Sequence, residues 1–595
     1  MKNFFLLLAA AALAHAAPAA KAKAPNSGKL ATVDSVRAAE TRQSEFYERV
    51  EIPTPAGEVC EVSSIALLPG KKVAIGTRRG DVWVAEGAYD ADVSKVKWTK
   101  FASNLHEPLG MFWKDGSLFA TQRPEHTRLT DKDGDGRADS FDTVCSKWGI
   151  SGDYHEYAFG SDPDKNGDVW MVLCLTGSFH AHAPWRGWAA KITPEGKFIP
   201  VASGIRSPGG IGHNDKGDFF YTDNQGVWNG SSSLKWLRAG SFQGNPTGNK
   251  SAALANFPAP PEPTSGSRIL AERLKFPEFV PPAVVLPHGK VGNSPSGVSC
   301  DMTKGKFGPW EGQMLVGEQT ASQVQRVNLE QVNGLYQGAV FHFLGGFEAG
   351  LIPVRMDQED GTLFIGGSNR GWGSRGSKTF TFERVRFKGK APFEMHDISA
   401  RADGFEVTFT QPVDAAAAAD VKNYTMDTFT YIYQSSYGSP EVDQTTPTVK
   451  SATVSADGLK VRLVVDGEDE HQVDDRQDRQ GGDEDLVAGV VQHAGIGIGP
   501  GGRVLLRLAR LGRASVFRKR RVAMCVENLV DIAAQAPECP DEFGVQLIGV
   551  VIEEQFHVAA DRPEMVAQVV HQPLRRVSTA AAGSSGPRRA SSRST

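Results

Sequence analysis

Two polar residues each precede a repeated hydrophobic segment and could take part in proton transfer or anion binding. His155 lies just before the segment that begins at Tyr157, and its imidazole could take a proton from a substrate hydroxyl. Arg206 precedes the segment that begins at Gly210, and its guanidinium would suit a carboxylate-bearing ligand. Either side chain could equally be a structural hydrogen-bonding group, and their shared place at the edge of successive repeats is what links them.

Further polar residues occupy comparable places. His288 lies ahead of the segment at residues 293–297, and Arg370 and Arg375 lie in a glycine-rich segment after the last repeat. Each is a candidate for the same site or for a contact that stabilises the fold. The sequence therefore predicts one site built from distant parts of the chain.

A run of acidic residues has the spacing of a calcium-binding loop. Carboxylates stand at loop positions 1, 3, 5, 9 and 12, with glycine at position 6, and they are Asp131, Asp133, Asp135, Asp139 and Asp142. Asp142 replaces the usual glutamate, and no flanking helices are evident, so we expect a structural Ca²⁺ held by a loop between strands. A solvated acidic turn is the alternative.

One phrase recurs about six times between Ser63 and Ser368 and predicts the elements that position these residues. Each copy is a small or apolar lead-in, a short turn rich in Asp, Gly or Lys, and an apolar strand, as in Leu109 to Ala120. The copies lie roughly 45–55 residues apart, the period of a four-stranded propeller blade. We therefore expect an all-β chain with a six-bladed β-propeller over residues 45–390 and a central mouth lined by loops.

The start and the composition of the chain point to an exported protein. Lys2, an apolar run and Ala14-His15-Ala16 predict a signal peptide over residues 1–16, followed by a flexible leader over residues 17–44, so we expect a periplasmic or extracellular protein. The net charge of −4 argues against nucleic acid as a partner, and no later stretch predicts a membrane span. Motifs for serine hydrolases, phosphate-binding loops and zinc proteases are lacking.

The six cysteines leave their state open. Cys145 and Cys174 could form a disulfide in an exported protein, or they could be small buried side chains. No Cys-x-x-Cys-His motif is present, so covalently attached haem is not expected.

The C-terminal part divides into two regions. Residues 392–466 contain alternating strand patterns that predict a small immunoglobulin-like β-sandwich with fewer strands than the seven such a module needs. Residues 467–595 are rich in Arg and contain neither Trp nor Tyr. We interpret them as translated from a shifted reading frame or as a fusion scar that truncates the sandwich; a genuine disordered or partly helical tail is the alternative.

Residues 45–466 resemble the glucose/sorbosone dehydrogenase propellers, in particular a secreted bacterial branch. The resemblance rests on the repeats, on His155, on residues 204–212 with the following 217–224, on the acidic loop and on residues 369–375. It implies an enzyme dependent on pyrroloquinoline quinone (PQQ), with the quinone and Ca²⁺ at the propeller mouth.

The resemblance also implies roles for individual residues. His155 would be the general base and Arg206 would contact the cofactor, with Ser207 at the position of the family's asparagine. We expect Arg370 and His288 as further cofactor contacts because of their place at the edge of the repeats. The substrate would be a sugar or aldose, and a separate acceptor such as a cytochrome would receive the electrons. The alternative is a non-catalytic propeller that binds glycans or protein partners at its mouth.

Overall fold

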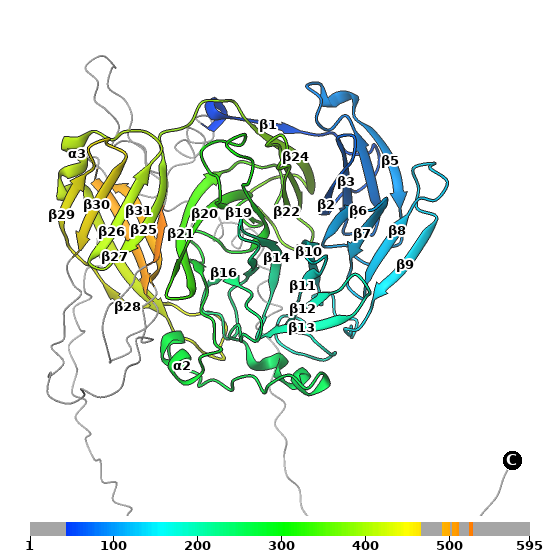
Figure 1. The fold of residues 1–595 in the computed structure, drawn as a ribbon, viewed down its shortest axis with the longest axis horizontal. Helices are drawn as coiled ribbons and strands as arrows, with labels where there is room; N and C mark the ends of the chain where they lie inside the picture. The colour runs from blue at the N-terminus through cyan, green and yellow to red at the C-terminus, as the bar shows by residue number, and fades with distance from the viewer. Residues whose placement is uncertain (1–42, 466–490, 500–502, 511–522, 527–595) are drawn as a thin grey trace, which may run out of the picture. The chain divides into compact units, whose positions relative to one another are not determined.

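The chain forms six blades of four antiparallel strands arranged as a propeller, which confirms the predicted all-β fold class; five blades are separate sheets, and the fifth continues into a nine-stranded sheet. The computed structural model describes residues 43–465, 491–499, 503–510 and 523–526 (Figure 1). The first three blades are β2(Val62–Leu68), β3(Lys72–Thr77), β4(Val82–Glu86) and β5(Lys97–Ala102); β6(Met111–Lys114), β7(Ser117–Thr121), β8(His126–Thr130) and β9(Ser140–Cys145); and β10(Ala158–Pro163), β11(Val169–Leu173), β12(Trp188–Ile192) and β13(Phe198–Ser203).

The remaining three blades follow the same order from the centre outward. They are β14(Pro208–His213), β15(Phe219–Asp223), β16(Ser232–Trp236) and β17(Val284–Leu286); β18(Pro295–Cys300), β19(Met314–Glu318), β20(Gln323–Val332) and β21(Leu335–Leu344); and β22(Leu351–Met356), β23(Leu363–Ser368), β24(Phe380–Phe387) and β1(Tyr47–Glu51). The Asp/Gly/Lys turns of the repeated phrase join the first and second strands, as at Asp115 and Gly116 between β6 and β7.

The N-terminal strand closes the ring. Each of the innermost strands β2, β6, β10, β14, β18 and β22 contacts the next, and β22 contacts β2. Strand β1 pairs antiparallel with β24, with Tyr47 opposite Phe387 and Glu51 opposite Glu383, so the first strand of the chain is the outermost strand of the last blade.

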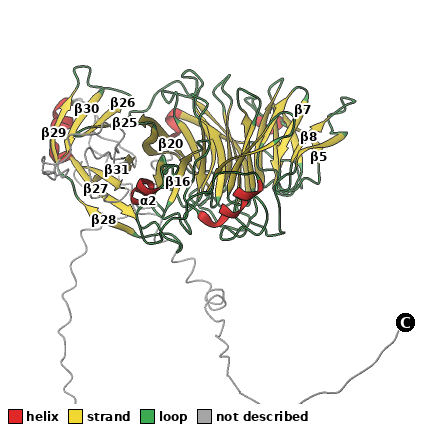
Figure 2. Cartoon of the chain, turned by 60° about the horizontal axis from the view of Figure 1, so that its bottom comes forward, coloured by secondary structure: helices red, strands yellow, loops and turns green. Residues whose placement is uncertain are grey.

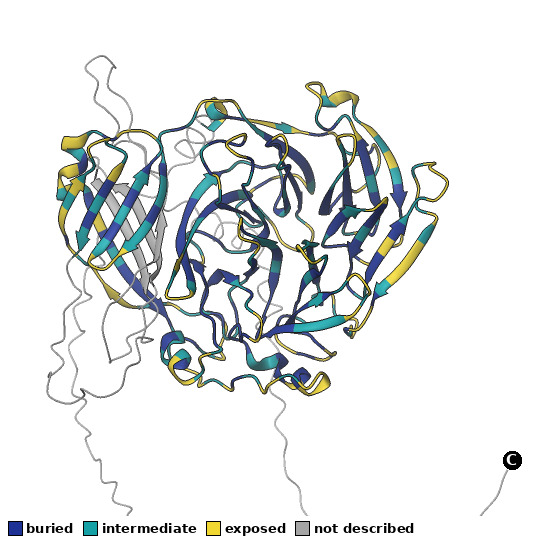
Figure 3. Ribbon diagram, in the orientation of Figure 1, coloured by how far each residue is buried: buried dark blue, intermediate teal, exposed yellow. Residues whose placement is uncertain are grey.

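Apolar side chains between the blades form the core. In Figure 3 the strands near the centre are mostly buried, and exposed residues gather on outer strands and loops. The largest fully buried side chains include Trp188 and Trp310. Because an isolated four-stranded sheet leaves both faces in water, this burial requires the neighbouring blades.

Helices are few and short (Figure 2). The segment between β16 and β17 contains η2(Pro246–Leu254) and α2(Ile269–Lys275), and the remaining short helices among the described residues are η1(Val93–Lys95), α3(Ala415–Ala419) and η3(Val421–Asn423). Within the described ranges, no helix has the length and apolar character needed to cross a bilayer.

A second β module follows the propeller. Strands β25(Met395–Arg401), β26(Gly404–Phe409), β30(Lys460–Val465) and β29(Val449–Val454) form one sheet, while β27(Tyr424–Tyr431) and β28(Glu441–Thr445) belong to a second. The second sheet also contains β31(Val491–Gly499), β32(Arg503–Arg510) and β33(Ala523–Val526), and β33 pairs with β21. The structure thus describes three strands within the stretch that the sequence suggested to be a frameshifted tail.

Two other predictions from the sequence, a disulfide and a signal peptide, have different outcomes. Cys60, Cys145, Cys174 and Cys300 are buried and free, so Cys145 and Cys174 are not joined by a disulfide. The signal peptide and nearly all of the leader lie outside the described residues, and export stays a prediction.

Tyr47 offers a test of the closure by β1. Its hydroxyl accepts a hydrogen bond from Trp310 Nε1 at 2.6 Å, and its ring is buried among Phe307, Phe343 and Phe387. We expect Tyr47→Ala to lower the free energy of unfolding by about 3–5 kcal/mol, because it removes a core aromatic ring.

Tyr47→Phe should cost about 1–3 kcal/mol, because the Trp310 N–H loses its acceptor. Both are measured by urea unfolding, with the half-exposed Phe141 (Phe141→Ala) as the control, expected to change stability by less than about 0.5 kcal/mol. Equal effects for Tyr47→Ala and the control would contradict closure by β1.

Candidate functional site at the propeller mouth

His155 and Arg206 lie in loops at the same end of the propeller. His155 lies in the loop that enters β10, and Arg206 lies in the loop that enters β14, so both precede innermost strands of adjacent blades. Burial, and after it the positive charge of Arg206, lowers the pKa of His155 to about 4. The imidazole is therefore neutral at pH 7 and able to accept a proton.

Aromatic rings hold the imidazole of His155. Its ring centroid lies 4.9 Å from that of Tyr154 and 5.1 Å from that of Tyr157, the latter edge-on. Its backbone N–H donates to Asp153 Oδ1 at 2.8 Å, which fixes the loop. These contacts orient the ring while leaving the residue partly exposed.

Two arginines that the sequence did not predict as site residues complete this side of the mouth. Arg78 and Arg123 come from the loops between the second and third strands of the first two blades, and both pair with Glu107, at 2.7 Å and 3.8 Å. Arg78 Nη2 also donates to the hydroxyl of Tyr157 at 3.0 Å. The only sequence signal for Arg78 and Arg123 was their position, just after the second strand of each blade.

The guanidinium of Arg206 is buried without a carboxylate partner among the described residues. Its exposed fraction is 4%, and Nη1 donates to the carbonyl oxygen of Gln225 at 2.6 Å. Within residues 43–465, neither Nε nor Nη2 has a hydrogen-bond partner. The rings of Tyr437 and Phe179 lie 5.2 Å and 5.7 Å from its central carbon. A buried cation in this state favours an anionic ligand.

Gly226 is required for this packing. A Cβ at Gly226 would lie 2.1 Å from Cζ of Arg206, so the guanidinium can lie against the backbone only where no side chain is present. The φ angle of Gly226 is not positive, so its backbone conformation does not require glycine. The close approach of Arg206 to its Cα explains why glycine occupies this position.

A buried ion pair holds the backbone behind Arg206. Asp223, at the end of β15, accepts hydrogen bonds from the backbone N–H of Ser207 at 2.7 Å and from Nζ of Lys235 at 3.0 Å. The side chains of Asp223 and Lys235 are 0% and 3% exposed. The pair thus fixes the turn from which Arg206 projects.

Two other predicted cofactor contacts, Arg370 and Ser207, lie in different surroundings. Arg370 lies at the mouth, half-exposed, where its carbonyl oxygen accepts from Arg78 Nη1 at 3.0 Å and its own Nη1 lies 3.4 Å from Glu61. The hydroxyl of Ser207 is buried and bonds to Ser178 Oγ at 3.1 Å, so a contact of Ser207 with a ligand stays a prediction.

His288 has no hydrogen bond or ion pair to the His155 group within residues 43–465, and Arg375 lies in the loop after β23. His288 is exposed and follows β17, the outermost strand of its blade. Arg375 donates its backbone N–H to Thr320 O at 2.8 Å in the last blade's loop. A role for His288 in cofactor binding stays a prediction.

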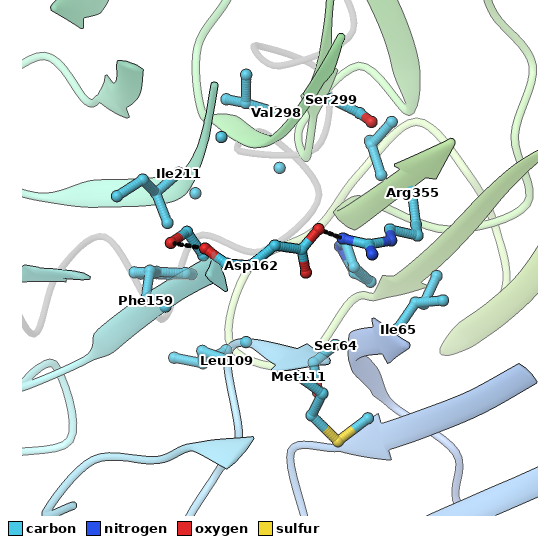
Figure 4. A pocket seen from close by; sticks show the side chains of 18 of the residues that line it. Ser64, Ile65, Leu109, Met111, Phe159, Asp162, Ile211, Val298, Ser299 and Arg355 are labelled. Carbon is cyan, nitrogen blue, oxygen red and sulfur yellow. Dashed lines mark hydrogen bonds and ion pairs between the residues drawn. The ribbon is translucent and has the colours of Figure 1, made fainter. Parts of the chain in front are cut away.

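A cavity of about 250 Å³ lies on the propeller axis between the innermost strands. Asp162 of β10 and Arg355 of β22 form an ion pair across it, and small or apolar residues such as Ile211 and Val298 surround them (Figure 4). Its volume is below that of a typical pocket for a drug-sized ligand. The mouth, with its arginines and His155, is the better candidate site.

The acidic loop lies between β8 and β9, away from the mouth. Because the strands alternate in direction, this turn is at the opposite end of the blade from the β7–β8 loop that holds Arg123. Ligand oxygens of Asp131, Asp133 and Asp139 lie within 4.8 Å of one another. The five-ligand pattern is not reproduced, because Asp135 is outside this group and Asp142 belongs to β9.

Asp142 pairs with Arg128 at 2.9 Å across the strands. The oxygens of the remaining loop carboxylates accept backbone N–H groups, as when Asp131 Oδ2 accepts from Gly136 N at 2.9 Å. Three carboxylates could hold a hard cation there, and a Ca²⁺ bound to them would not contact a ligand at the mouth.

Comparisons with known proteins give the following matches. The family model "Domain of unknown function (DUF7133)" matches residues 79–365, and no curated protein matches the chain. Solved structures similar to this chain include the PQQ-bound aldose sugar dehydrogenase of Streptomyces coelicolor, with 14% identity and a TM-score of 0.40 over 57% of this chain and 98% of that one.

The holo PQQ domain of pyranose dehydrogenase from Coprinopsis cinerea matches with 10% identity and a TM-score of 0.39 over 57% of this chain and 95% of that one. A calcium structure of a family AA12 carbohydrate-active enzyme from Trichoderma reesei matches with 12% identity and a TM-score of 0.40, over 57% and 95% of the two chains. These neighbours include proteins of the kind that the sequence motifs resemble. The six-bladed architecture itself rests on the strand pairing described above.

The Asp223–Lys235 pair provides a test of how the mouth is held. We expect Lys235→Met to lower the free energy of unfolding by about 3–5 kcal/mol, because it leaves a buried carboxylate without its cation. The exposed pair of Lys95 and Asp92, 80% and 53% exposed, supplies the matched control. Lys95→Met should change stability by less than about 0.5 kcal/mol in the same chemical unfolding experiment, and equal losses would argue against a buried pair.

Proposed function

We propose that the chain is an exported PQQ-dependent sugar or aldose dehydrogenase that passes electrons to an external acceptor such as a cytochrome. The observation that carries the proposal is the pairing of a neutral His155 with the buried guanidinium of Arg206, which has no carboxylate partner among the described residues. One group can accept a proton, and the other can receive an anion beside it.

The residues present at the mouth fit a quinone that carries carboxylates. Arg206 is a buried cation without a carboxylate partner among the described residues, and its guanidinium could donate hydrogen bonds to a carboxylate of the ligand, with the half-exposed Arg370 also at the mouth. When bound, the quinone would supply the hydride-accepting chemistry of the reaction. The PQQ-bound neighbours named above are in keeping with this assignment.

His155 would take the proton from the sugar hydroxyl as the C–H bond breaks. A base with a pKa near 4 is weak for this task, because proton transfer is most efficient when the pKa is near the working pH. An anion bound at Arg206 would offset the positive charge that lowers the pKa of His155. Ligand binding would thereby raise the basicity of the imidazole.

The mouth could instead bind glycans or a partner protein without catalysis. The observation in favour of this alternative is the exposure of Tyr154, Phe179 and Tyr437 at the mouth, since exposed aromatic groups often mark binding surfaces. Oxidation of a sugar by the protein would distinguish the dehydrogenase from a propeller that only binds glycans or proteins.

The decisive experiment adds PQQ and Ca²⁺ to the purified protein and measures quinone binding and then dye reduction with aldoses. We expect binding and turnover in the wild type. His155→Ala should retain quinone binding and lose about 10²–10⁴-fold in kcat, the range for loss of a general base. Arg206→Ala should lose quinone affinity.

The pH dependence follows from the lowered pKa. In the free protein His155 binds a proton only as the pH falls to about 4, whereas an unfolded histidine does so at about 6.5. The neutral base therefore persists through pH 5–6 in the protein without PQQ. The acidic limb of kcat/KM reports the PQQ-bound protein and should lie between about pH 4 and pH 6.5, because the bound anion raises the pKa of His155. Binding of PQQ should raise the pKa of His155 in an NMR titration.

Absence of quinone binding and of dye reduction would favour the non-catalytic alternative.

We further propose a structural Ca²⁺ at Asp131, Asp133 and Asp139. Binding to the folded state alone stabilises by about 2.7 kcal/mol at a hundredfold excess over Kd, so Ca²⁺ should raise the melting temperature and EGTA should reverse the rise. Asp131→Asn should abolish the shift. Asp142→Asn, whose carboxylate pairs with Arg128, should retain it. A melting temperature independent of Ca²⁺ in the wild type would refute this site.

A further inference from the structure

The C-terminal module contributes an exposed tyrosine to the mouth of the propeller. Tyr437 lies in the loop between β27 and β28 and is 58% exposed. This loop is hydrogen-bonded to the fourth blade: Trp228 N–H donates to Gln434 O at 2.7 Å, and Gly438 N–H donates to Gly226 O at 3.0 Å. Tyr437 therefore sits on the segment against which Arg206 packs.

A second tyrosine anchors the same loop. Tyr433 is 1% exposed, its hydroxyl donates to Gly244 O, and its backbone N–H donates to Ser267 O at 3.0 Å. With anchors on both sides, the backbone of Tyr437 is fixed although its ring faces solvent. A ring held in this way loses little conformational freedom when a ligand stacks on it.

The ring of Tyr437 has an aromatic neighbour. Its centroid lies 6.1 Å from that of Phe179, which is 44% exposed, and both rings adjoin the guanidinium of Arg206. Tyr154, 62% exposed, lies beside His155 on the neighbouring loop. Exposed aromatic side chains thus extend outward from the base and the cation.

We propose that Tyr437 and Phe179 form a subsite for a second sugar ring, so that the substrate is an oligosaccharide whose reducing end reaches His155. This inference rests on the proposed function. The C–H face of a pyranose ring stacks on aromatic rings, and its hydroxyls need polar groups at the edges. The side-chain N–H groups of Gln225 and Gln434 donate to Gly230 O and Gly438 O, and their amide oxygens could accept from sugar hydroxyls. Tyr437 is then a specificity-determining residue.

The polar surroundings favour a saccharide over a protein partner. The aromatic rings are interleaved with Arg206, Gln225 and two exposed histidines, His180 and His182, and do not form one apolar patch. The core of a protein interface is more apolar and depleted in charge. A stacking subsite for a polar ring fits this composition better.

The test is a series of reducing oligosaccharides of one to four units, assayed with the wild type and with Tyr437→Ala in the presence of PQQ and Ca²⁺. We expect kcat/KM of the wild type to rise about tenfold from one unit to two, and this rise to disappear in Tyr437→Ala. The ratio of kcat/KM for two units to that for one unit, taken within each variant at saturating PQQ, separates this effect from any change in PQQ affinity or in monosaccharide turnover. Tyr437→Phe keeps the ring and should behave as the wild type. Phe141→Ala, a half-exposed ring on β9, is the control.

A binding assay separates failure of this inference from failure of the proposed function. The same oligosaccharides with reduced ends cannot be oxidised at the first carbon, and their affinity for the protein without PQQ is measured by calorimetry. The disaccharide alcohol should bind about tenfold more weakly to Tyr437→Ala than to Tyr437→Phe. Equal affinities for the two variants, or a kcat/KM independent of chain length in an active wild type, would overturn the subsite. An inactive wild type that keeps this difference in affinity would refute only the dehydrogenase.

Discussion

The close approach of innermost strands around the axis is the constraint on which the rest of the structure depends. A Cβ at Gly110 would lie 2.3 Å from Gly160 O, and one at Gly210 would lie 2.6 Å from Gly297 Cα, so neighbouring blades can meet only where these side chains are absent. Convergence at the axis brings the loops at one end of every blade together. It also requires a closed ring, which β1 completes by pairing with β24.

Because the innermost strands converge, the polar groups at the mouth come from loops of several blades. Arg78 of the first blade reaches the hydroxyl of Tyr157, which leads into the third, and the charge of Arg206 acts on His155 across adjacent loops. Asp223 and Lys235 then fix the Arg206 turn from inside the fourth blade. The charge environment of His155 is therefore a property of several blades, and no single repeat contains it.

The sequence predicted what repeats and left unpredicted what depends on pairing between distant segments. The period and the turns predicted six blades and placed His155 and Arg206 at the same edge, because local strand order determines both. The role of β1 and the Arg78–Glu107–Arg123 group could not be predicted, since their partners lie in other blades. The calcium-loop spacing counted Asp142 as a ligand, but β9 begins at Ser140, and strand pairing places that carboxylate opposite Arg128.

Two buried arginines show how hydrogen bonding separates a structural cation from one available to a ligand. Arg326 is 1% exposed, lies 3.8 Å over the ring of Trp310, and donates from both terminal nitrogens, to His396 O at 2.8 Å and Met395 O at 2.7 Å. These bonds join the fifth blade to the first strand of the C-terminal module and engage both terminal nitrogens, while Nε has no hydrogen-bond partner among the described residues.

Arg206 has a similar burial and similar aromatic neighbours, but it donates from Nη1 alone to the Asn224 and Gln225 carbonyls. Desolvating a cation costs free energy, and Arg326 recovers more of it than Arg206 does, because both of its terminal nitrogens have acceptors. More of this free energy can be recovered when a hydrogen-bond acceptor of a ligand binds to Arg206. Because Tyr437 of the C-terminal module covers one side of this group, the same module that Arg326 attaches to the propeller also shapes the entrance to Arg206.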